Sequence, residues 1–224
     1  MNVSLLDVVG PVMIGPSSSH TAGAAKLAKT ARLIYNKPFN RVEFGLGGSF
    51  AKTYRGHFTD YALVAGAMGM SEDDENLSRS FDVAKEQGIT FRFYPRDIQS
   101  EYENTARITF YNDEEHTAFY VEGASLGGGR ILVTSINGLA CEVNATSPTI
   151  IVQQHDVAGV VSEVSTILAE NGINIGIMKV GRDTRGGTAY CIIECDEFID
   201  PAIMKKLRAA KNVLSATVVN IKAE

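Results

Sequence analysis

A dense group of polar side chains lies over residues 15–21, whose sequence is Gly-Pro-Ser-Ser-Ser-His-Thr. The members that can hydrogen-bond are Ser17, Ser18, Ser19, His20 and Thr21. They directly precede an apolar stretch, residues 22–34, that predicts a helix. Because a helix start has free backbone N–H groups and partial positive charge, the group suits a carboxylate or a phosphate. The alternative is structural: Ser19 or Thr21 caps the helix and does nothing more.

A second loop, residues 53–60, also precedes an apolar helix, which we expect over residues 61–68. It contains His57, Thr59 and Asp60. Imidazole, hydroxyl and carboxylate groups this close together can act in proton transfer, and histidine titrates near neutral pH. The alternative is that Asp60 caps the helix and His57 is an ordinary surface histidine.

A third unusual segment, residues 125–129, has the sequence Ser-Leu-Gly-Gly-Gly. Consecutive glycines permit positive φ angles and a close approach of the backbone to another group. The segment is not a dinucleotide-binding fingerprint, because no Gly-x-Gly-x-x-Gly opens a helix after it. The acidic run over residues 72–75 is either a metal site or, more simply, a solvated helix start.

Alternating helices and strands are predicted to position these loops in the first 147 residues. We expect helices over residues 4–9, from 22 to about 36, over 61–68 and up to about 87. Strands are predicted over 41–46, 89–94, 106–111, 118–122, 131–136 and 139–145. Asn137-Gly138 is the strongest short hairpin signal in the chain, and Ser147-Pro148 marks a domain boundary.

The last third of the chain predicts a βαββαβ order, which is the ferredoxin-like arrangement. Strands are expected over 149–153, 173–180, 188–195 and 213–221, with helices after Asp156 and after Asp200-Pro201. The predicted fold class is therefore α+β, with an N-terminal α/β domain over residues 1–147 and a second domain over residues 148–224.

Composition excludes several classes of partner. The 224 residues carry a net charge of −5, so no basic excess is present to bind nucleic acid. No apolar run reaches the roughly 20 residues of a membrane span, and the N-terminus lacks the pattern of a signal peptide. Three cysteines, at positions 141, 191 and 195, form no paired framework. We therefore expect a cytoplasmic protein whose cysteines are small core residues.

The segments over residues 151–160 and 170–175 resemble an ACT domain. ACT domains sense small molecules, often amino acids, and usually pair side by side. In ACT domains that bind serine, the ligand contacts match Gln154, Asp156 and Asn174 here. Ala158 stands where proline is usual, and Gln154 where histidine can bind serine. A domain that only dimerises, with Asp156 and Asn174 in capping and turn roles, is the alternative.

The segments over residues 15–21, 56–60 and 125–129, taken together, resemble the β component of bacterial iron–sulfur L-serine dehydratases. The resemblance implies an N-terminal domain like the allosteric substrate-binding domain of some phosphoglycerate dehydrogenases. It also implies a partner α subunit that holds a [4Fe-4S] cluster. The resemblance implies the conversion of L-serine into pyruvate and ammonia, although a related hydroxy amino acid is the alternative substrate, and this chain alone would be inactive.

The same resemblance implies a role for each polar residue of the loops. His57 would be the base that takes the Cα proton, while an iron of the partner polarises the hydroxyl group. Thr59 and Asp60 would order the loop, and the group from Ser17 to Thr21 would bind the substrate carboxylate. A non-catalytic amino-acid sensor acting through the ACT domain is the alternative function. A hydrolase with a Ser–His pair is disfavoured, because no Gly-x-Ser-x-Gly elbow is present.

Overall fold

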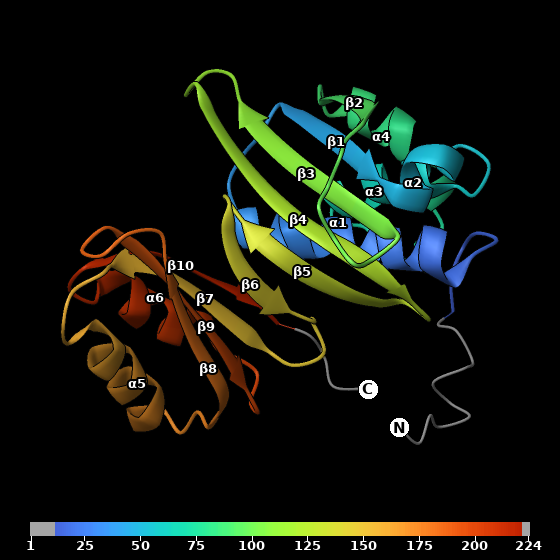
Figure 1. Ribbon diagram of the computed structural model, residues 1–224. Coiled ribbons are helices and arrows are strands. Elements are labelled where there is room, and N and C mark those ends of the chain that lie inside the picture. The colour runs from blue at the N-terminus through green and yellow to red at the C-terminus, as the bar shows by residue number, and fades with distance from the viewer. Residues whose placement is uncertain (1–11, 221–224) are drawn as a thin grey trace. The chain divides into compact units, whose positions relative to one another are not determined.

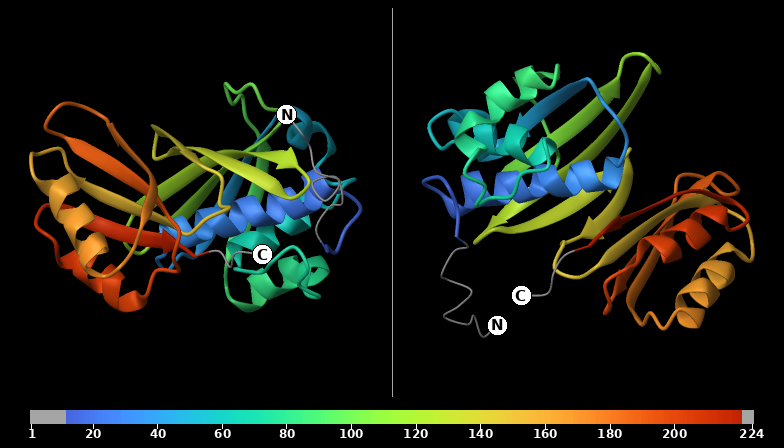
Figure 2. Two further views of the ribbon diagram at one scale, coloured as in Figure 1. Left: turned by 90° about the horizontal axis from the view of Figure 1, so that it is seen from below. Right: turned by 180° about the vertical axis from the view of Figure 1, so that it is seen from behind.

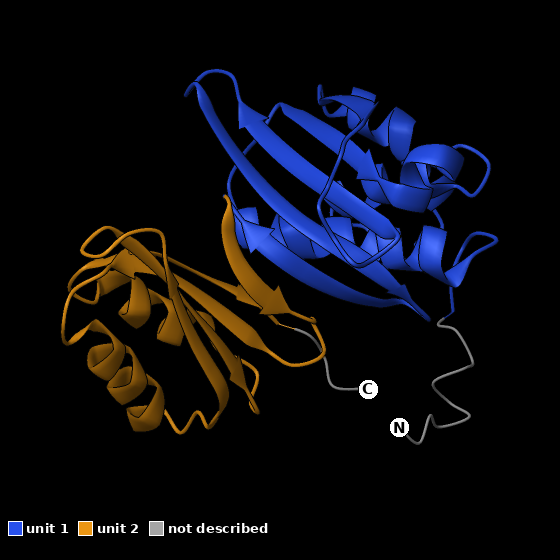
Figure 3. Ribbon diagram, viewed as in Figure 1, with its two compact units in different colours: residues 1–137 blue, residues 138–224 orange. Residues whose placement is uncertain are grey.

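A computed structural model describes residues 12–220 of the chain, and the fold is α+β (Figure 1). The chain divides into two compact units, residues 1–137 and 138–224, which Figure 3 colours separately. The helix predicted over residues 4–9 lies outside the described residues, as does the last residue of the predicted final strand, Ile221.

The first unit contains five of the six strands predicted for residues 1–147, and one helix, α2, that was not predicted. The sixth predicted strand, over residues 139–145, lies in the second unit. The strands of the first unit are β1 (Arg41–Gly47), β2 (Thr90–Pro95), β3 (Asn104–Asn112), β4 (Thr117–Gly127) and β5 (Arg130–Ile136). Its helices are α1 (Gly23–Tyr35), α2 (Gly48–Thr53), α3 (Thr59–Ala67) and α4 (Ser80–Glu86). Short turns precede two of the helices: the π-helical turn η2 (Ser18–Ala22) and the 3-10 turn η3 (Leu77–Arg79).

The strands of this unit form a sheet in the order β2-β1-β3-β4-β5. β1 and β2 are parallel, and the other neighbouring pairs are antiparallel. Alternate residues of the strands, among them Phe44, Ile108 and Phe110, are fully buried. These residues pack under α1 and α3, which cover one face of the sheet (Figure 2). The alternation follows from the two-residue period of a strand with one apolar face.

Helices α1 and α3 pack against each other more closely than ordinary side chains allow. A Cβ atom on Gly66 of α3 would lie 2.2 Å from the carbonyl oxygen of Ala25 and 2.8 Å from the Cβ of Ala28. At the start of α3, the Thr21 hydroxyl donates to the carbonyl oxygen of His57 at 3.0 Å. The two helices therefore run in the same direction and begin at the same end of the unit.

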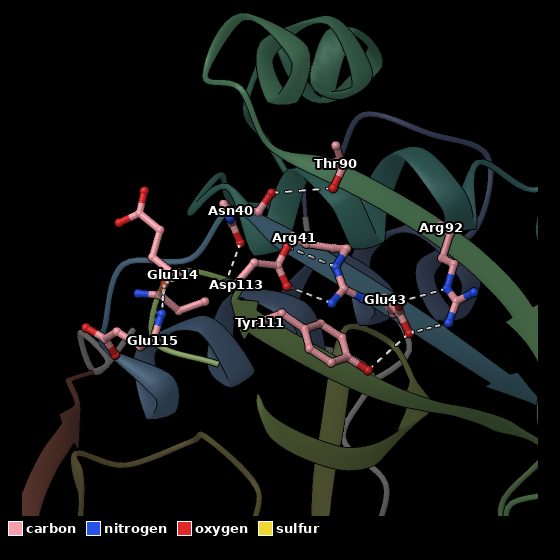
Figure 4. Close-up of polar contacts among 10 residues, drawn as sticks. Asn40, Arg41, Glu43, Thr90, Arg92, Tyr111, Asp113, Glu114 and Glu115 are labelled. Carbon is pink, nitrogen blue, oxygen red and sulfur yellow. Dashed lines mark hydrogen bonds and ion pairs between the residues drawn. The ribbon is translucent and has the colours of Figure 1, made fainter. Parts of the chain in front are cut away.

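The opposite face of the sheet carries an ionic network centred on Glu43 (Figure 4). The Glu43 carboxylate is only 2% exposed and accepts hydrogen bonds from Arg41 at 2.5 Å, Arg92 at 2.9 Å and Tyr111 at 3.1 Å. Arg41 also pairs with Asp113 at 2.8 Å and lies over the Tyr111 ring. Three strands are thus joined by one buried carboxylate whose acceptor sites are well used.

The second unit begins with β6 (Leu139–Val143), after a turn in which Asn137 and Gly138 both have positive φ. Its other elements are β7 (Thr149–His155), α5 (Val160–Glu170), β8 (Ile175–Arg182), β9 (Thr188–Cys195), α6 (Pro201–Ala209) and β10 (Val213–Val219). The order β10-β7-β9-β8, with antiparallel neighbours, confirms the predicted βαββαβ arrangement. None of the helices in the described part of the chain has the length and apolarity that crossing a membrane requires.

Candidate active site

The structure brings the three unusual loops together at the starts of α1 and α3. The second loop is joined to the first by the hydrogen bond from the Thr21 hydroxyl to the carbonyl oxygen of His57. The glycine segment is also joined to the first loop: the backbone N–H of Gly129 donates to the carbonyl oxygen of Ser18 at 3.3 Å. The starts of α1 and α3 therefore lie close together, and the start of α1 is suited to an anion.

The first loop continues into the π-helical turn η2, and the capping residue is Ser17. Its hydroxyl oxygen accepts the backbone N–H of His20 at 3.2 Å. The capping alternative is therefore wrong for Ser19 and Thr21. Ser19 is hydrogen-bonded to the ring of His20 instead, and Thr21 to the second loop. The surplus hydroxyl groups join the parts of the site to one another.

The imidazole of His20 lies at the centre of the site. Its Nδ1 is 3.1 Å from the Ser19 hydroxyl, and its Nε2 is 3.2 Å from the hydroxyl of Ser49. Phe50 meets the ring edge-on at 5.4 Å between centroids, and the ring of His57 lies 4.9 Å away. Burial and the neighbouring His57 both lower the pKa of His20, so this ring is neutral at neutral pH.

His57 differs from His20 because its side chain is exposed. It lines an open pocket of about 420 Å³ together with Lys52, Thr53, Tyr54, Arg55 and Gly56. The next residue, Phe58, has a φ of 60°, which is uncommon for a residue with a large side chain. The loop thus holds an accessible imidazole beside the half-buried ring of His20.

Thr59 and Asp60 are both buried at the start of α3. The Thr59 hydroxyl has no hydrogen-bond partner among the described residues. Asp60 accepts the backbone N–H of Tyr61 at 3.0 Å, and burial raises the pKa of its carboxyl group. Within the described part of the chain, no hydrogen bond joins Asp60 to His57. These two residues pack in the interior at the base of the loop rather than hydrogen-bonding to the His57 ring.

The glycine segment, Gly127 to Gly129, has a backbone conformation that larger residues rarely adopt. The three φ angles are 88°, 61° and 73°, all in the region that favours glycine. Nearby, a Cβ atom on Gly23 would lie 1.9 Å from the hydroxyl oxygen of Ser125. That hydroxyl is buried and, among the described residues, has no partner. The first turn of α1 therefore lies directly on β4.

Sequence reasoning missed Ser49 and Phe50, the two residues of α2 that contact His20. The available signal was the segment Gly47-Gly48-Ser49 at the carboxyl end of β1. β1 is paired in parallel with β2, and the ends of parallel strands commonly carry site residues. The glycines were interpreted only as the end of a strand.

Two family models match the chain: serine dehydratase beta chain over residues 4–88 and ACT domain over residues 148–212. The probable L-serine dehydratase beta chain of Bacillus subtilis is 37% identical over 214 residues, covering 96% of each protein. The chain belongs to the serine dehydratase beta chain family. The L-serine dehydratase beta chain of Peptoniphilus asaccharolyticus is 36% identical over 221 residues, covering 97% of this chain and 98% of that one.

The chain is also similar to enzymes that are named for a different activity. The D-3-phosphoglycerate dehydrogenase of Bacillus subtilis is 27% identical over 199 residues. The match covers 88% of this chain and 37% of that enzyme. The two-domain arrangement therefore also occurs as part of a larger protein.

The cysteines of this family member do not fit the binding of an iron–sulfur cluster. Cluster ligands are closely spaced thiolates. Here burial keeps the thiols protonated, because it raises the pKa of Cys141 to about 12 and that of Cys191 and Cys195 to about 11. Among residues 12–220, no group of three or more His, Cys, Asp or Glu side chains is placed to hold a metal ion.

In the ACT domain, the three predicted effector residues do not lie together. Asp156 is at the end of the sheet where His155 pairs with Thr188, and it accepts hydrogen bonds from Arg182 and the Gly186 N–H. Asn174 is at the other end, before Ile175, and donates to Asp196 at 2.6 Å. Gln154 is buried, and its side-chain oxygen has no partner among the described residues. One copy of the domain does not form a single three-residue site.

Proposed function

We propose that the chain is the β subunit of an L-serine dehydratase, which converts L-serine into pyruvate and ammonia. The observation that carries the proposal is the meeting of three loops around His20 and His57, at two helix N-termini. The names of the two relatives that match nearly the whole chain support it. The work of this chain is to bind the substrate and to move one proton.

The substrate carboxylate would bind at the start of α1. The hydroxyl group of Ser18 and the start of the helix would supply donors there, and Ser17, Ser19, His20 and Thr21 would shape the pocket through their own hydrogen bonds. Among the described residues, the buried hydroxyls of Thr59 and Ser125 have no partner, which supports the presence of a polar ligand nearby. An anion is favoured by the partial positive charge at the start of α1.

His57 would take the proton from Cα of the substrate. Its imidazole is exposed on the open pocket, 4.9 Å between ring centroids from His20. Thr59 and Asp60 would hold the loop so that this ring faces the bound substrate. Loss of the β-hydroxyl as water requires an acid, and the proposed [4Fe-4S] cluster of an α subunit would supply a Lewis acid. The partner would therefore close the open side of the pocket.

The test is to combine the chain with its α subunit under anaerobic conditions and to measure pyruvate formed from L-serine. We expect activity only from the combination. His57→Asn should lower turnover by at least about 100-fold, which is typical for loss of a general base. His116→Asn is the matched control, because His116 lies exposed in the turn between β3 and β4. Turnover of the His57 variant within a few-fold of the parent would show that the base is another group.

We also propose that the ACT domain pairs with a second copy and binds a small amino acid there. β8 is an edge strand, and its side chains Ile177 and Val180 are 45% and 50% exposed. Two β8 edges paired antiparallel would place Asn174 of one copy near Asp156 of the other. This arrangement would complete the effector site that one copy lacks.

We also propose a domain boundary after residue 147 and a cytoplasmic location for the protein. A boundary between residues 147 and 148 is supported by the ACT family model, which begins at residue 148. A cytoplasmic location is supported by the three cysteines, which are thiols rather than disulfides.

A further inference from the structure

Ser49 is fixed in the site by its own backbone. Its N–H donates to the carbonyl oxygen of Glu103 at 2.6 Å, and its carbonyl oxygen accepts the hydroxyl of Thr53 at 2.8 Å. Its half-buried hydroxyl faces Nε2 of His20 at 3.2 Å. The oxygen of Ser49 therefore has a set position, and the ring of His20 must adapt to it.

A neutral imidazole carries one proton, so His20 donates from one ring nitrogen and accepts at the other. Both nitrogens face a hydroxyl group, Ser19 at Nδ1 and Ser49 at Nε2. A hydroxyl group can donate or accept, so two arrangements satisfy the ring. They differ in which end of the hydrogen-bonded chain keeps an unused O–H group for a ligand.

The hydroxyl of Ser17 favours one of these arrangements. Its oxygen already accepts the backbone N–H of His20, and it lies 3.3 Å from the hydroxyl of Ser19. If Ser17 donates to Ser19, and Ser19 donates to Nδ1, each of these hydroxyl groups gives one hydrogen bond and accepts one. In the opposite arrangement the Ser17 oxygen would accept two hydrogen bonds and its O–H group would donate none. A hydroxyl group that already accepts one hydrogen bond is a stronger donor of the next, which favours donation from Ser17. The ring proton is then on Nε2, and it is donated to Ser49.

We propose that Ser49 is a positioning residue that holds neutral His20 in its Nε2–H form and keeps its own O–H group free for the bound substrate. The proposal rests on the proposed function only for the identity of that substrate. In the opposite arrangement, Ser49 would donate to His20, and Ser17 would keep the free O–H group. The tautomer of His20 distinguishes the two.

The first experiment is ¹⁵N NMR of the imidazole side chains in the isolated full chain near pH 7.5. The chain has 4 histidines, and His20 is assigned by the loss of its signals in His20→Gln. We expect an Nε2–H ring in the parent and in Ser49→Thr, and a gain of the Nδ1–H form in Ser49→Ala. Ser165→Ala on α5 is the matched control, because its half-buried hydroxyl donates to the nearby carbonyl oxygen of Ser162, and it should leave the ring unchanged. An Nδ1–H ring in the parent, or no change in Ser49→Ala, overturns the proposal.

The second experiment measures the same variants in the complex with the α subunit. Ser49→Ala should lower kcat by at least about 10-fold, the effect of losing about 1.4 kcal/mol, and Ser49→Thr should restore most of it. Amide spectra of the isolated variants show whether each is folded. Full activity of a folded Ser49→Ala overturns the catalytic part of the proposal. An inactive parent complex overturns the proposed function, while the tautomer result stands by itself.

Discussion

Glu43 links three neighbouring strands on the face of the sheet that α1 and α3 do not cover. Burial opposes ionisation of its carboxyl group, but hydrogen bonds from Arg92, Tyr111 and Arg41 outweigh this effect and hold the pKa of Glu43 below its usual value. The ionised form is therefore favoured in the folded state. A carboxylate whose pKa is lowered by folding stabilises the fold above its unfolded pKa of about 4.3. That contribution is lost as the pH falls through the lower folded value.

We predict that Glu43→Gln lowers the free energy of unfolding by about 1–3 kcal/mol at pH 7, the range for a hydrogen bond to a charged group. The difference from the parent should narrow below pH 4, because the parent then loses the same ionised group. Urea denaturation at pH 7 and pH 3 measures both values. Asp113→Asn is the control: its carboxylate is exposed, so the loss should be smaller. An equal difference at both pH values would contradict the prediction.

Individual site residues were only partly predictable from the sequence. Polar residues crowded before a helix indicated a site, and the structure joins Ser19, His20 and Thr21 to other parts of it. The capping residue was not predictable, because the choice of Ser17 depends on the wider π-helical turn. Ser49 was missed because its contact with His20 is between residues 29 positions apart.

At the scale of elements, the direction and spacing of α1 and α3 decide where the site lies. Gly66 permits the close contact, since a Cβ atom there would overlap the backbone of α1 at Ala25. Backbone atoms cannot move aside as a flexible side chain can. The spacing of α1 and α3 therefore depends on a position with no side chain.

We predict that Gly66→Ala lowers the free energy of unfolding by about 1–3 kcal/mol, as overpacking does, although alanine is the better helix former. Thermal or urea denaturation of the chain measures this. Gly56→Ala is the matched control, because the nearest atom to its added Cβ would be 3.7 Å away. If Gly66→Ala were as stable as the parent, the helices would have room to separate.

Most elements followed from local pattern, and the exception has a physical reason. Strands with one buried face and helices with apolar spacing were predicted within a few residues of their ends. α2 was not, because it begins at Gly48, whose φ is 54°, and glycine disfavours helices. Tertiary contacts stabilise it instead: Phe50 is fully buried, and the Ser49 N–H is bonded to Glu103. Such contacts cannot be read from six residues.

At the scale of the whole molecule, the proposed effector site requires two chains. We predict that the protein self-associates through β8 and that Ile177→Lys combined with Val180→Lys raises the dissociation constant at least about 100-fold. Two buried apolar side chains exchanged for charges at an interface account for this change. Analytical ultracentrifugation measures it. Leu214→Lys is the control, since Leu214 is 47% exposed on β10 at the opposite edge of the same sheet. A parent that sediments as a monomer at micromolar concentration would contradict the prediction.

The hydrogen bond from Gly129 to Ser18 also bears on how the chain folds during synthesis. It closes the site with a contact between residues that are far apart in sequence, and such contacts form slowly because a long loop must be ordered first. A nascent chain that ends before Gly129 lacks this closure, although α1 and α3 have already been synthesised. We therefore expect the anion site to mature only after the turn between β4 and β5 leaves the ribosome, and recognition by a partner subunit to be post-translational or late in translation.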